Sequence, residues 1–107
     1  WGFAGDVVEA IWLMMQQAKP DTYVIATGET HSVKDFVEAA FTHLGLDWRK
    51  YVKIDERFFR PLEPHRVCGD ASKARRALHW KPKVSFSELV KMMVESDLAL
   101  VSREQNA

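Results

Sequence analysis

Cysteine, glycine and proline are scarce in this 107-residue chain, which has one Cys, five Gly and four Pro. The single thiol, Cys68, has no partner in the chain for a disulfide or a cysteine-based metal cluster. That usage is typical of a reducing compartment, so we expect a cytoplasmic protein. With 47% hydrophobic residues as well, the composition excludes a disordered or low-complexity chain and predicts a packed fold.

Net charge and long apolar runs are lacking too. Fifteen Lys and Arg balance fifteen Asp and Glu, which argues against a partner such as nucleic acid or an anionic membrane surface. The longest apolar stretch, around 10–15, is far shorter than the roughly 20 residues of a membrane span. One domain, residues 1–107, is expected to bury roughly 60 to 70% of its unfolded surface. Because the chain starts abruptly on apolar residues without Met, we expect it to be part of a longer protein.

Helical spacing of apolar residues predicts three main helices and one short one. A start signal precedes each main helix: Gly5-Asp6 with Glu9, then Ser32 with Asp35, then Ser85 with Glu88. The expected helices cover 6–18, 33–44, the short segment 71–78, and a final stretch that runs from the third signal toward residue 102.

Two or three short strands are expected between these helices. Residues 22–27 are rich in β-branched and aromatic side chains, as in a buried strand, and 52–55 alternate as in an edge strand. Residues 47–51 predict a single helical turn, and two prolines in four positions make 58–64 a stiff loop. The predicted fold class is therefore α/β, as a small α+β-like lobe.

The candidate binding residues lie in that loop, in the sequence Arg60-Pro61-Leu62-Glu63. A guanidinium presents a planar fork of donors that suits phosphate oxygens, and a carboxylate can accept from two vicinal hydroxyls. Proline reduces the freedom lost on binding, so a diphosphate and a ribose are natural ligands. The alternative is a surface Arg–Glu pair contributing under about 1 kcal/mol.

The histidines and tyrosines of the chain indicate neither a metal site nor a catalytic site. The four histidines are widely separated and lack ligand spacing, so no metal site is expected. The sequence has no glycine-rich dinucleotide loop of the G-x-G-x-x-G type. Neither Tyr23 nor Tyr51 is followed four positions later by Lys, so the Tyr-x-x-x-Lys pair of short-chain dehydrogenases is missing. We expect no cofactor site and no catalytic residue in this chain.

Several motifs together resemble the C-terminal third of bacterial-type GDP-mannose 4,6-dehydratases, members of the extended short-chain dehydrogenase/reductase family. The resemblance covers nearly the whole chain, and its most distinctive part is Y-V-I-A-T-G-E-T-H-S-V at 23–33. The other motifs are W-G-F-A-G-D at 1–6, F-R-P-L-E at 59–63, G-D-A-S-K-A at 69–74 and W-K-P-K at 80–83.

This resemblance implies a lyase that uses NADP to convert GDP-mannose into GDP-4-keto-6-deoxymannose, a step of deoxyhexose synthesis. Arg60 would contact the diphosphate and Glu63 the ribose hydroxyls of GDP-mannose or GDP. The NADP loop and the catalytic Tyr and Lys would lie in an N-terminal Rossmann half, a partner that this chain lacks. The chain alone would then be inactive.

Three positions depart from the family pattern. His79 replaces the usual Gly of a turn, and Pro64 and His65 replace the residues that commonly follow the glutamate, so Glu63 could be re-aimed. Two alternatives to a substrate-binding lobe stay open. One is a free-standing, non-catalytic remnant that binds partners or forms a homo-oligomer, and the other is the equivalent lobe of another nucleotide-sugar epimerase or reductase.

Overall fold

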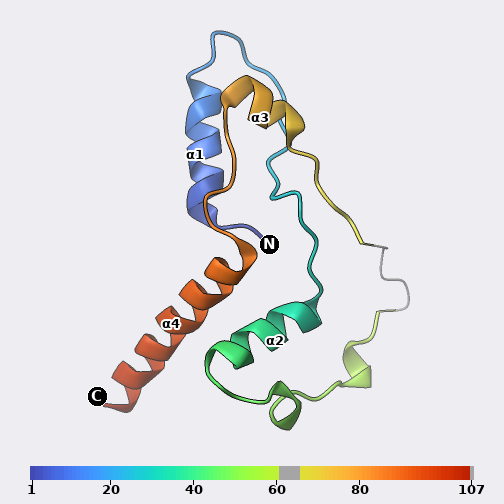
Figure 1. The fold of residues 1–107 in the computed structure, drawn as a ribbon, viewed down its shortest axis with the longest axis vertical. Helices are drawn as coiled ribbons and strands as arrows, with labels where there is room; N and C mark the ends of the chain where they lie inside the picture. Colours follow the sequence, from blue (N-terminus) through green and yellow to red (C-terminus); the bar gives the residue numbers. More distant parts are fainter. Residues whose placement is uncertain (61–65, 107) are drawn as a thin grey trace. The chain divides into compact units, whose positions relative to one another are not determined.

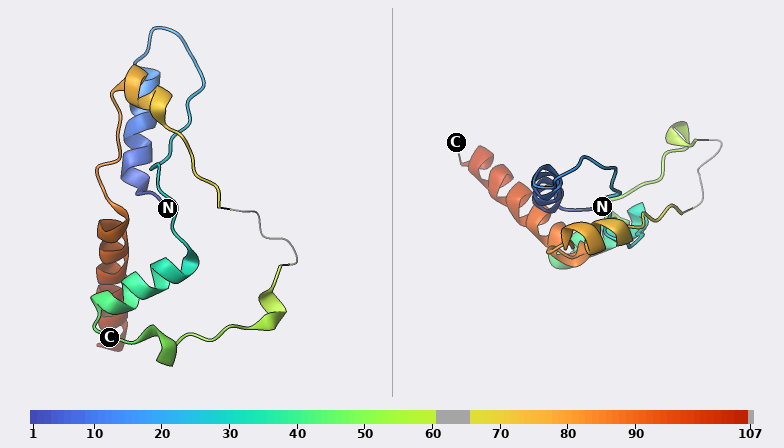
Figure 2. Two further views of the ribbon diagram at one scale, coloured as in Figure 1. Left: turned by 45° about the vertical axis from the view of Figure 1, so that its right-hand side comes forward. Right: turned by 90° about the horizontal axis from the view of Figure 1, so that it is seen from above.

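The computed structural model describes residues 1–60 and 66–106, and the described part is rich in helix (Figure 1). The elements in chain order are α1 (Ala4–Met15), α2 (Val33–His43), the 3-10 turns η1 (Trp48–Lys50) and η2 (Glu56–Phe58), α3 (Ser72–Leu78) and α4 (Phe86–Gln105). The four expected helices are confirmed, and the expected turn at 47–51 corresponds to η1. Figure 2 shows the same elements in two further views.

The chain divides into two compact units. Unit 1 combines Trp1–Thr30 with Val67–Leu89, and unit 2 combines His31–Arg66 with Val90–Ala107. Helix α4 therefore begins in unit 1, and its part from Val90 onward belongs to unit 2.

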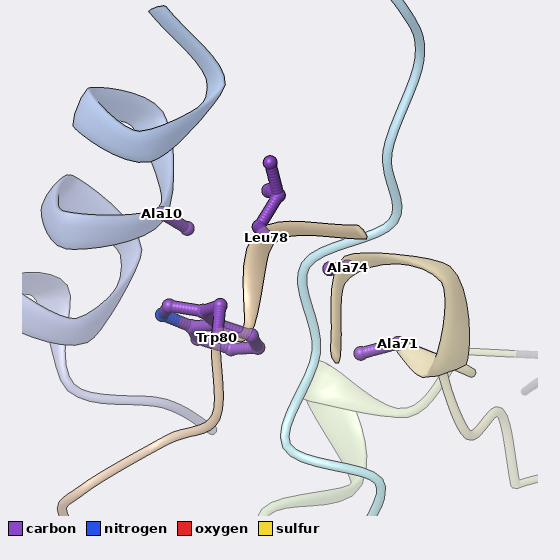
Figure 3. Packing of buried hydrophobic residues seen from close by; sticks show 5 residues of the cluster. All are labelled: Ala10, Ala71, Ala74, Leu78 and Trp80. Carbon is purple, nitrogen blue, oxygen red and sulfur yellow. The ribbon is translucent and has the colours of Figure 1, made fainter. Parts of the chain in front are cut away.

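The core of unit 1 lies where α1 meets α3 and the segment that follows α3. Ala10 of α1 and Ala74 of α3 are both fully buried, and small side chains there let the two helices approach closely. Leu78 and Trp80 are buried beside them, and Ala71 completes the cluster. Figure 3 shows the Ala10 side chain pointing from α1 toward Trp80 and Leu78.

Asp6 has a different role from the N-terminal cap predicted for it. Helix α1 begins at Ala4 with Phe3 as its N-cap, and no side chain caps this end. Asp6 is instead buried, and its Oδ2 atom accepts hydrogen bonds from the backbone N–H groups of Lys83 and Val84, both at 3.1 Å. Its backbone carbonyl accepts from Nε1 of Trp80 at 2.8 Å. One residue of α1 therefore fixes the chain that leads into α4.

Helix α3 ends on a left-handed residue, His79, with φ 53° and ψ 31°. This conformation is uncommon for residues other than glycine, which meets no steric penalty there. His79 adopts this conformation at a small cost in free energy that a glycine at the same turn would avoid.

In unit 2, α2 begins with the capping box predicted from Ser32 and Asp35. The Asp35 N–H donates to Ser32 Oγ at 3.0 Å, and the Ser32 N–H donates to Asp35 Oδ2 at 2.9 Å. These hydrogen bonds, first that from the Ser32 backbone, hold the pKa of the Asp35 carboxyl below its ordinary value. At the other end of α2, Nε2 of His43 lies 3.3 Å from Oε1 of Glu95 on α4.

The two predicted strands are wrong, because residues 22–27 and 52–55 carry no strand and none is formed within 1–60 and 66–106. The side chains of the first segment nevertheless alternate between the core and solvent, as in a strand. Tyr23 and Ile25 pack on the core of unit 1, whereas Val24 is 53% exposed. A strand also needs a ladder of backbone hydrogen bonds to a neighbouring segment, and residues 22–27 form none within 1–60 and 66–106, although Gly69 lies directly against Ala26.

Helix α1 carries an exposed apolar stripe. The stripe is formed by Val8, Ile11, Trp12 and Met15, all at least 49% exposed.

Candidate functional site

Arg60 is an exposed residue of unit 2, two positions beyond the end of η2. Within 1–60 and 66–106, no acidic side chain forms an ion pair with Arg60. Phe58 and Phe59, immediately before it, are 77% and 66% exposed. This segment therefore presents two aromatic rings and a cation to solvent.

The neighbouring arginine is already engaged. Nη2 of Arg57 lies 2.7 Å from Oδ2 of Asp55, and Nε of Arg57 also donates to that carboxylate. The Arg57 guanidinium holds the pKa of the Asp55 carboxyl below its ordinary value, and the Arg57 backbone N–H adds to this effect. Asp55 thus caps η2 and pairs with Arg57, whose side chain remains 83% exposed.

Glu63, the second predicted binding residue, lies outside the described residues, as do Pro61, Pro64 and His65. The predicted pairing of Arg60 with Glu63 around one ligand therefore stays a prediction, and so does the effect of Pro64 on Glu63. The predicted stiff loop is described only up to Arg60.

A pocket that was not predicted from the sequence lies in unit 1, with a volume of about 290 Å³. Its walls come from residues 1–3 and 6–7 at the start of α1, from 25–29, from Val67 and Gly69, and from Trp80 and Pro82. Residues 27–29 belong to the most distinctive sequence motif of the chain. The signal that could have indicated a pocket there is Gly28, whose φ of 80° turns the backbone sharply after an apolar run.

Packing and local hydrogen bonds hold the pocket walls. The Glu29 N–H donates to Thr27 Oγ1 at 3.3 Å, and Thr30 Oγ1 donates to the carbonyl of Val67 at 3.1 Å. At Gly69 an added Cβ would lie 2.5 Å from the Cβ of Ala26, so only glycine allows these two segments to approach so closely. Two of the stretches that line the pocket, 25–29 and 67–69, therefore lie directly against each other.

The pocket does not fit the NADP that the resemblance implies. None of the described residues lining it is Lys, Arg or His, whereas two of them, Asp6 and Glu29, are acidic. A dinucleotide needs backbone N–H groups or cations around its pyrophosphate, and this pocket offers carboxylates. We therefore assign no cofactor contact to these residues.

Metal binding finds no support in the described ranges, where no three His, Cys, Asp or Glu side chains gather at a common point. Cys68 is exposed, and its thiol donates a long hydrogen bond of 3.9 Å to the carbonyl of Gly69. No helix of the described chain has the length and apolar character to cross a membrane.

Comparison with known proteins defines the class of protein. Residues 1–93 match the family described as GDP-mannose 4,6 dehydratase. The chain is 59% identical over 105 residues to GDP-mannose 4,6 dehydratase 1 of Arabidopsis thaliana, covering 98% of this chain and 29% of that protein. It is 46% identical over 120 residues to GDP-mannose 4,6 dehydratase of Drosophila melanogaster, covering 96% of this chain and 30% of the fly protein. It is 42% identical over 124 residues to the human GDP-mannose 4,6 dehydratase, covering 100% and 33%.

The chain belongs to the GDP-mannose 4,6-dehydratase family. It spans about 29% of the length of the Arabidopsis relative and 33% of the human one. The alignment with the human protein extends over 124 positions, more than the 107 residues of this chain, so the human protein carries additional residues within the matched region.

Proposed function

We propose that this chain is the nucleotide-sugar-binding part of a GDP-mannose 4,6-dehydratase and binds GDP-mannose through Arg60 and Glu63. The observation that carries the proposal is family membership over residues 1–93, with 59% identity to a plant relative across 98% of the chain. The exposed position of Arg60 supports the diphosphate contact.

The two residues would recognise different parts of the nucleotide. Arg60 donates from a planar fork to diphosphate oxygens, and Glu63 accepts from the two ribose hydroxyls. A hydrogen bond to a charged group contributes roughly 1.5 to 3 kcal/mol in a site shielded from water and less in an open one. Binding by the isolated chain is therefore expected to be weak.

Catalysis and NADP binding are assigned to residues outside this chain. The sequence has neither a G-x-G-x-x-G loop nor a Tyr-x-x-x-Lys pair, and hydride transfer by a nicotinamide needs a site that holds the dinucleotide. The partner is a Rossmann half. The exposed apolar stripe of α1 supports such a partner, because large exposed apolar patches mark interaction surfaces.

Isothermal titration calorimetry with GDP-mannose, GDP and guanosine tests the diphosphate contact. Arg60→Ala should weaken GDP and GDP-mannose binding about tenfold and leave guanosine unaffected, since guanosine lacks the diphosphate. Arg75→Ala removes an exposed arginine of α3 in unit 1 and is the matched control. Equal GDP affinity for the wild type and Arg60→Ala would remove the proposed role of Arg60.

The ribose contact and the lack of activity are tested separately. Glu63→Gln should weaken binding of GDP more than binding of 2′-deoxy-GDP, because the deoxy ligand offers one hydroxyl fewer. Incubation of the chain with NADP and GDP-mannose should yield no 4-keto product. Formation of that product would contradict the assignment of catalysis to residues elsewhere.

A second function is favoured by one observation, the exposed stripe Val8, Ile11, Trp12 and Met15. A free-standing chain with this stripe would associate with itself and act as a non-catalytic oligomerisation module. Sedimentation of the wild type and of Trp12→Glu distinguishes the two functions. A monomer at all concentrations argues against the module, and an oligomer that Trp12→Glu dissociates supports it.

A further inference from the structure

The C-terminal part of α4 carries a row of apolar side chains that unit 2 leaves half open. Val94, Leu98 and Val101 follow one another at helical spacing, so they lie on one face of α4. Together with Leu44, the C-cap of α2, they line a groove with a volume of about 250 Å³. Leu98 and Val101 are 51% and 48% exposed, and such a row gains free energy when a partner covers it.

One edge of this groove is acidic. Asp97 lines the groove, and Glu104 lies about two helical turns further along α4, which places both carboxylates on the same edge of the apolar row. Within 1–60 and 66–106, neither carboxylate forms an ion pair. Lys91 lies toward the opposite edge of the row. The open surface therefore combines aliphatic side chains with two carboxylates that the described chain leaves unpaired.

A helix with the opposite charge pattern is complementary to this surface. Amphipathic helices dock in apolar grooves through side chains at positions i, i+3 or i+4, and i+7. Two Lys or Arg residues spaced by two turns on the flank of such a helix would meet Asp97 and Glu104, and charge complementarity also fixes the orientation of docking. A second copy of this chain is a poor occupant. Two antiparallel α4 helices joined through this face would bring the acidic edges of both copies together, and like charges repel.

We propose that the groove formed by Leu44 and α4 is a docking site for a basic amphipathic helix of a partner protein. The aliphatic row binds the apolar face of that helix, and Asp97 and Glu104 bind its cations. Arg60 and Glu63 take no part, so this surface goes beyond the proposed nucleotide-sugar binding. Four of the five groove residues also lie beyond residues 1–93, the part of the chain that matches the family.

Fluorescence anisotropy of the full chain with two labelled synthetic peptides tests the site. Both peptides are amphipathic helix formers with Leu on the apolar face; one carries Lys on the flanking positions, and the other carries Glu at the same positions. The Lys peptide should bind the wild type about tenfold more tightly than the Glu peptide, and about 0.5 M salt should reduce this difference because it screens exposed charges.

Reversing the charge of the groove should reverse the preference between the peptides. Asp97→Lys should weaken binding of the Lys peptide about tenfold and strengthen binding of the Glu peptide. The matched control is Glu56→Lys, which makes the same change in charge at an exposed acid of η2 and should leave both affinities unchanged.

Leu98→Ala tests the apolar part of the groove independently. Its side chain is half exposed, so the truncation should not disturb the fold, and it should weaken binding of the Lys peptide severalfold. Trp12→Glu should leave peptide binding unchanged, which distinguishes the groove from the stripe of α1. Arg60→Ala should also leave it unchanged, whatever its effect on GDP binding, which separates this inference from the proposed function.

Several results would overturn the assignment. These are no binding of the Lys peptide to the wild type, equal binding of the two peptides, wild-type affinity after both Asp97→Lys and Leu98→Ala, or loss of binding in Trp12→Glu. Sedimentation that shows an oligomer dissociated by Leu98→Ala would also overturn it, because a second copy of the chain would then cover the groove.

Discussion

Replacing Asp6 tests the attachment of α1 to the chain that leads into α4. Its Oδ2 atom accepts from the backbone N–H groups of Lys83 and Val84, both at 3.1 Å, and the residue is 6% exposed. Asp6→Ala leaves both donors without this acceptor. A hydrogen bond to a charged group contributes roughly 1.5 to 3 kcal/mol, and water reaches part of this site, so the expected loss is about 2 to 4 kcal/mol.

That loss is large beside the roughly 5 to 15 kcal/mol by which most domains are stable. Asp6→Asn keeps a carbonyl oxygen that can accept both bonds, so it should cost about 1 kcal/mol, from the lost charge alone. Urea unfolding followed by far-ultraviolet circular dichroism at 25 °C measures these differences from the shift in midpoint and the slope.

The matched control is Glu9→Gln, which removes an exposed ion pair of α1 with Nζ of Lys83 at 2.9 Å. A surface pair of this kind contributes under about 1 kcal/mol. If Asp6→Ala costs no more than Glu9→Gln, or if Asp6→Asn is as damaging as Asp6→Ala, the backbone hydrogen bonds are not what stabilises this junction.

Three further predictions concern backbone conformation and helix capping. His79→Gly should raise the free energy of unfolding by up to about 1 kcal/mol, because the φ of residue 79 is 53° and glycine adopts this value without strain. His79→Ala should give no such increase in the free energy of unfolding, and thermal melting measures both variants. Gly69→Ala should cost about 1 to 3 kcal/mol through the clash with Ala26, and the double variant with Ala26→Gly should recover most of the loss in urea unfolding. The pKa of Asp35 is lowered in the folded chain, so its carboxylate stabilises the fold. This contribution to the free energy of unfolding is fully present above the ordinary aspartate pKa of about 3.9 and is lost as the pH falls through the lowered value. Asp35→Asn should abolish that acid-dependent part, whereas Ser32→Ala, which keeps the backbone N–H that donates to Asp35, should only reduce it; helical circular dichroism from pH 5 downward to about pH 2 measures both.

The helices were predictable because their determinants are local. The capping box at Ser32 and the apolar spacing of α2 lie within the element itself, so bounds of 33–44 were predicted where Val33–His43 is observed.

The strands and the role of Asp6 depend on distant residues, and there the predictions were wrong. A run such as 22–27 has the side chains of a strand, but a ladder also needs a second backbone. Asp6 resembles an N-cap in sequence, and only the return of the chain 77 positions later reveals that its carboxylate binds Lys83. For the candidate site, Arg60 is exposed as a ligand-binding residue must be, and the pocket of unit 1 could not be foreseen because its walls come from segments far apart in sequence.

The four tryptophans lie in very different surroundings, which gives each unit its own optical reporter. Trp80 is 3% exposed in unit 1, whereas Trp1 and Trp12 are 51% and 59% exposed. Trp48 belongs to unit 2, where the Arg49 guanidinium lies 5.6 Å from its ring centroid. A variant that retains only Trp80 should emit at short wavelength and report on unit 1, and one that retains only Trp48 should report on unit 2. Comparing their fluorescence transitions would reveal whether the two units unfold as one cooperative body or one after the other.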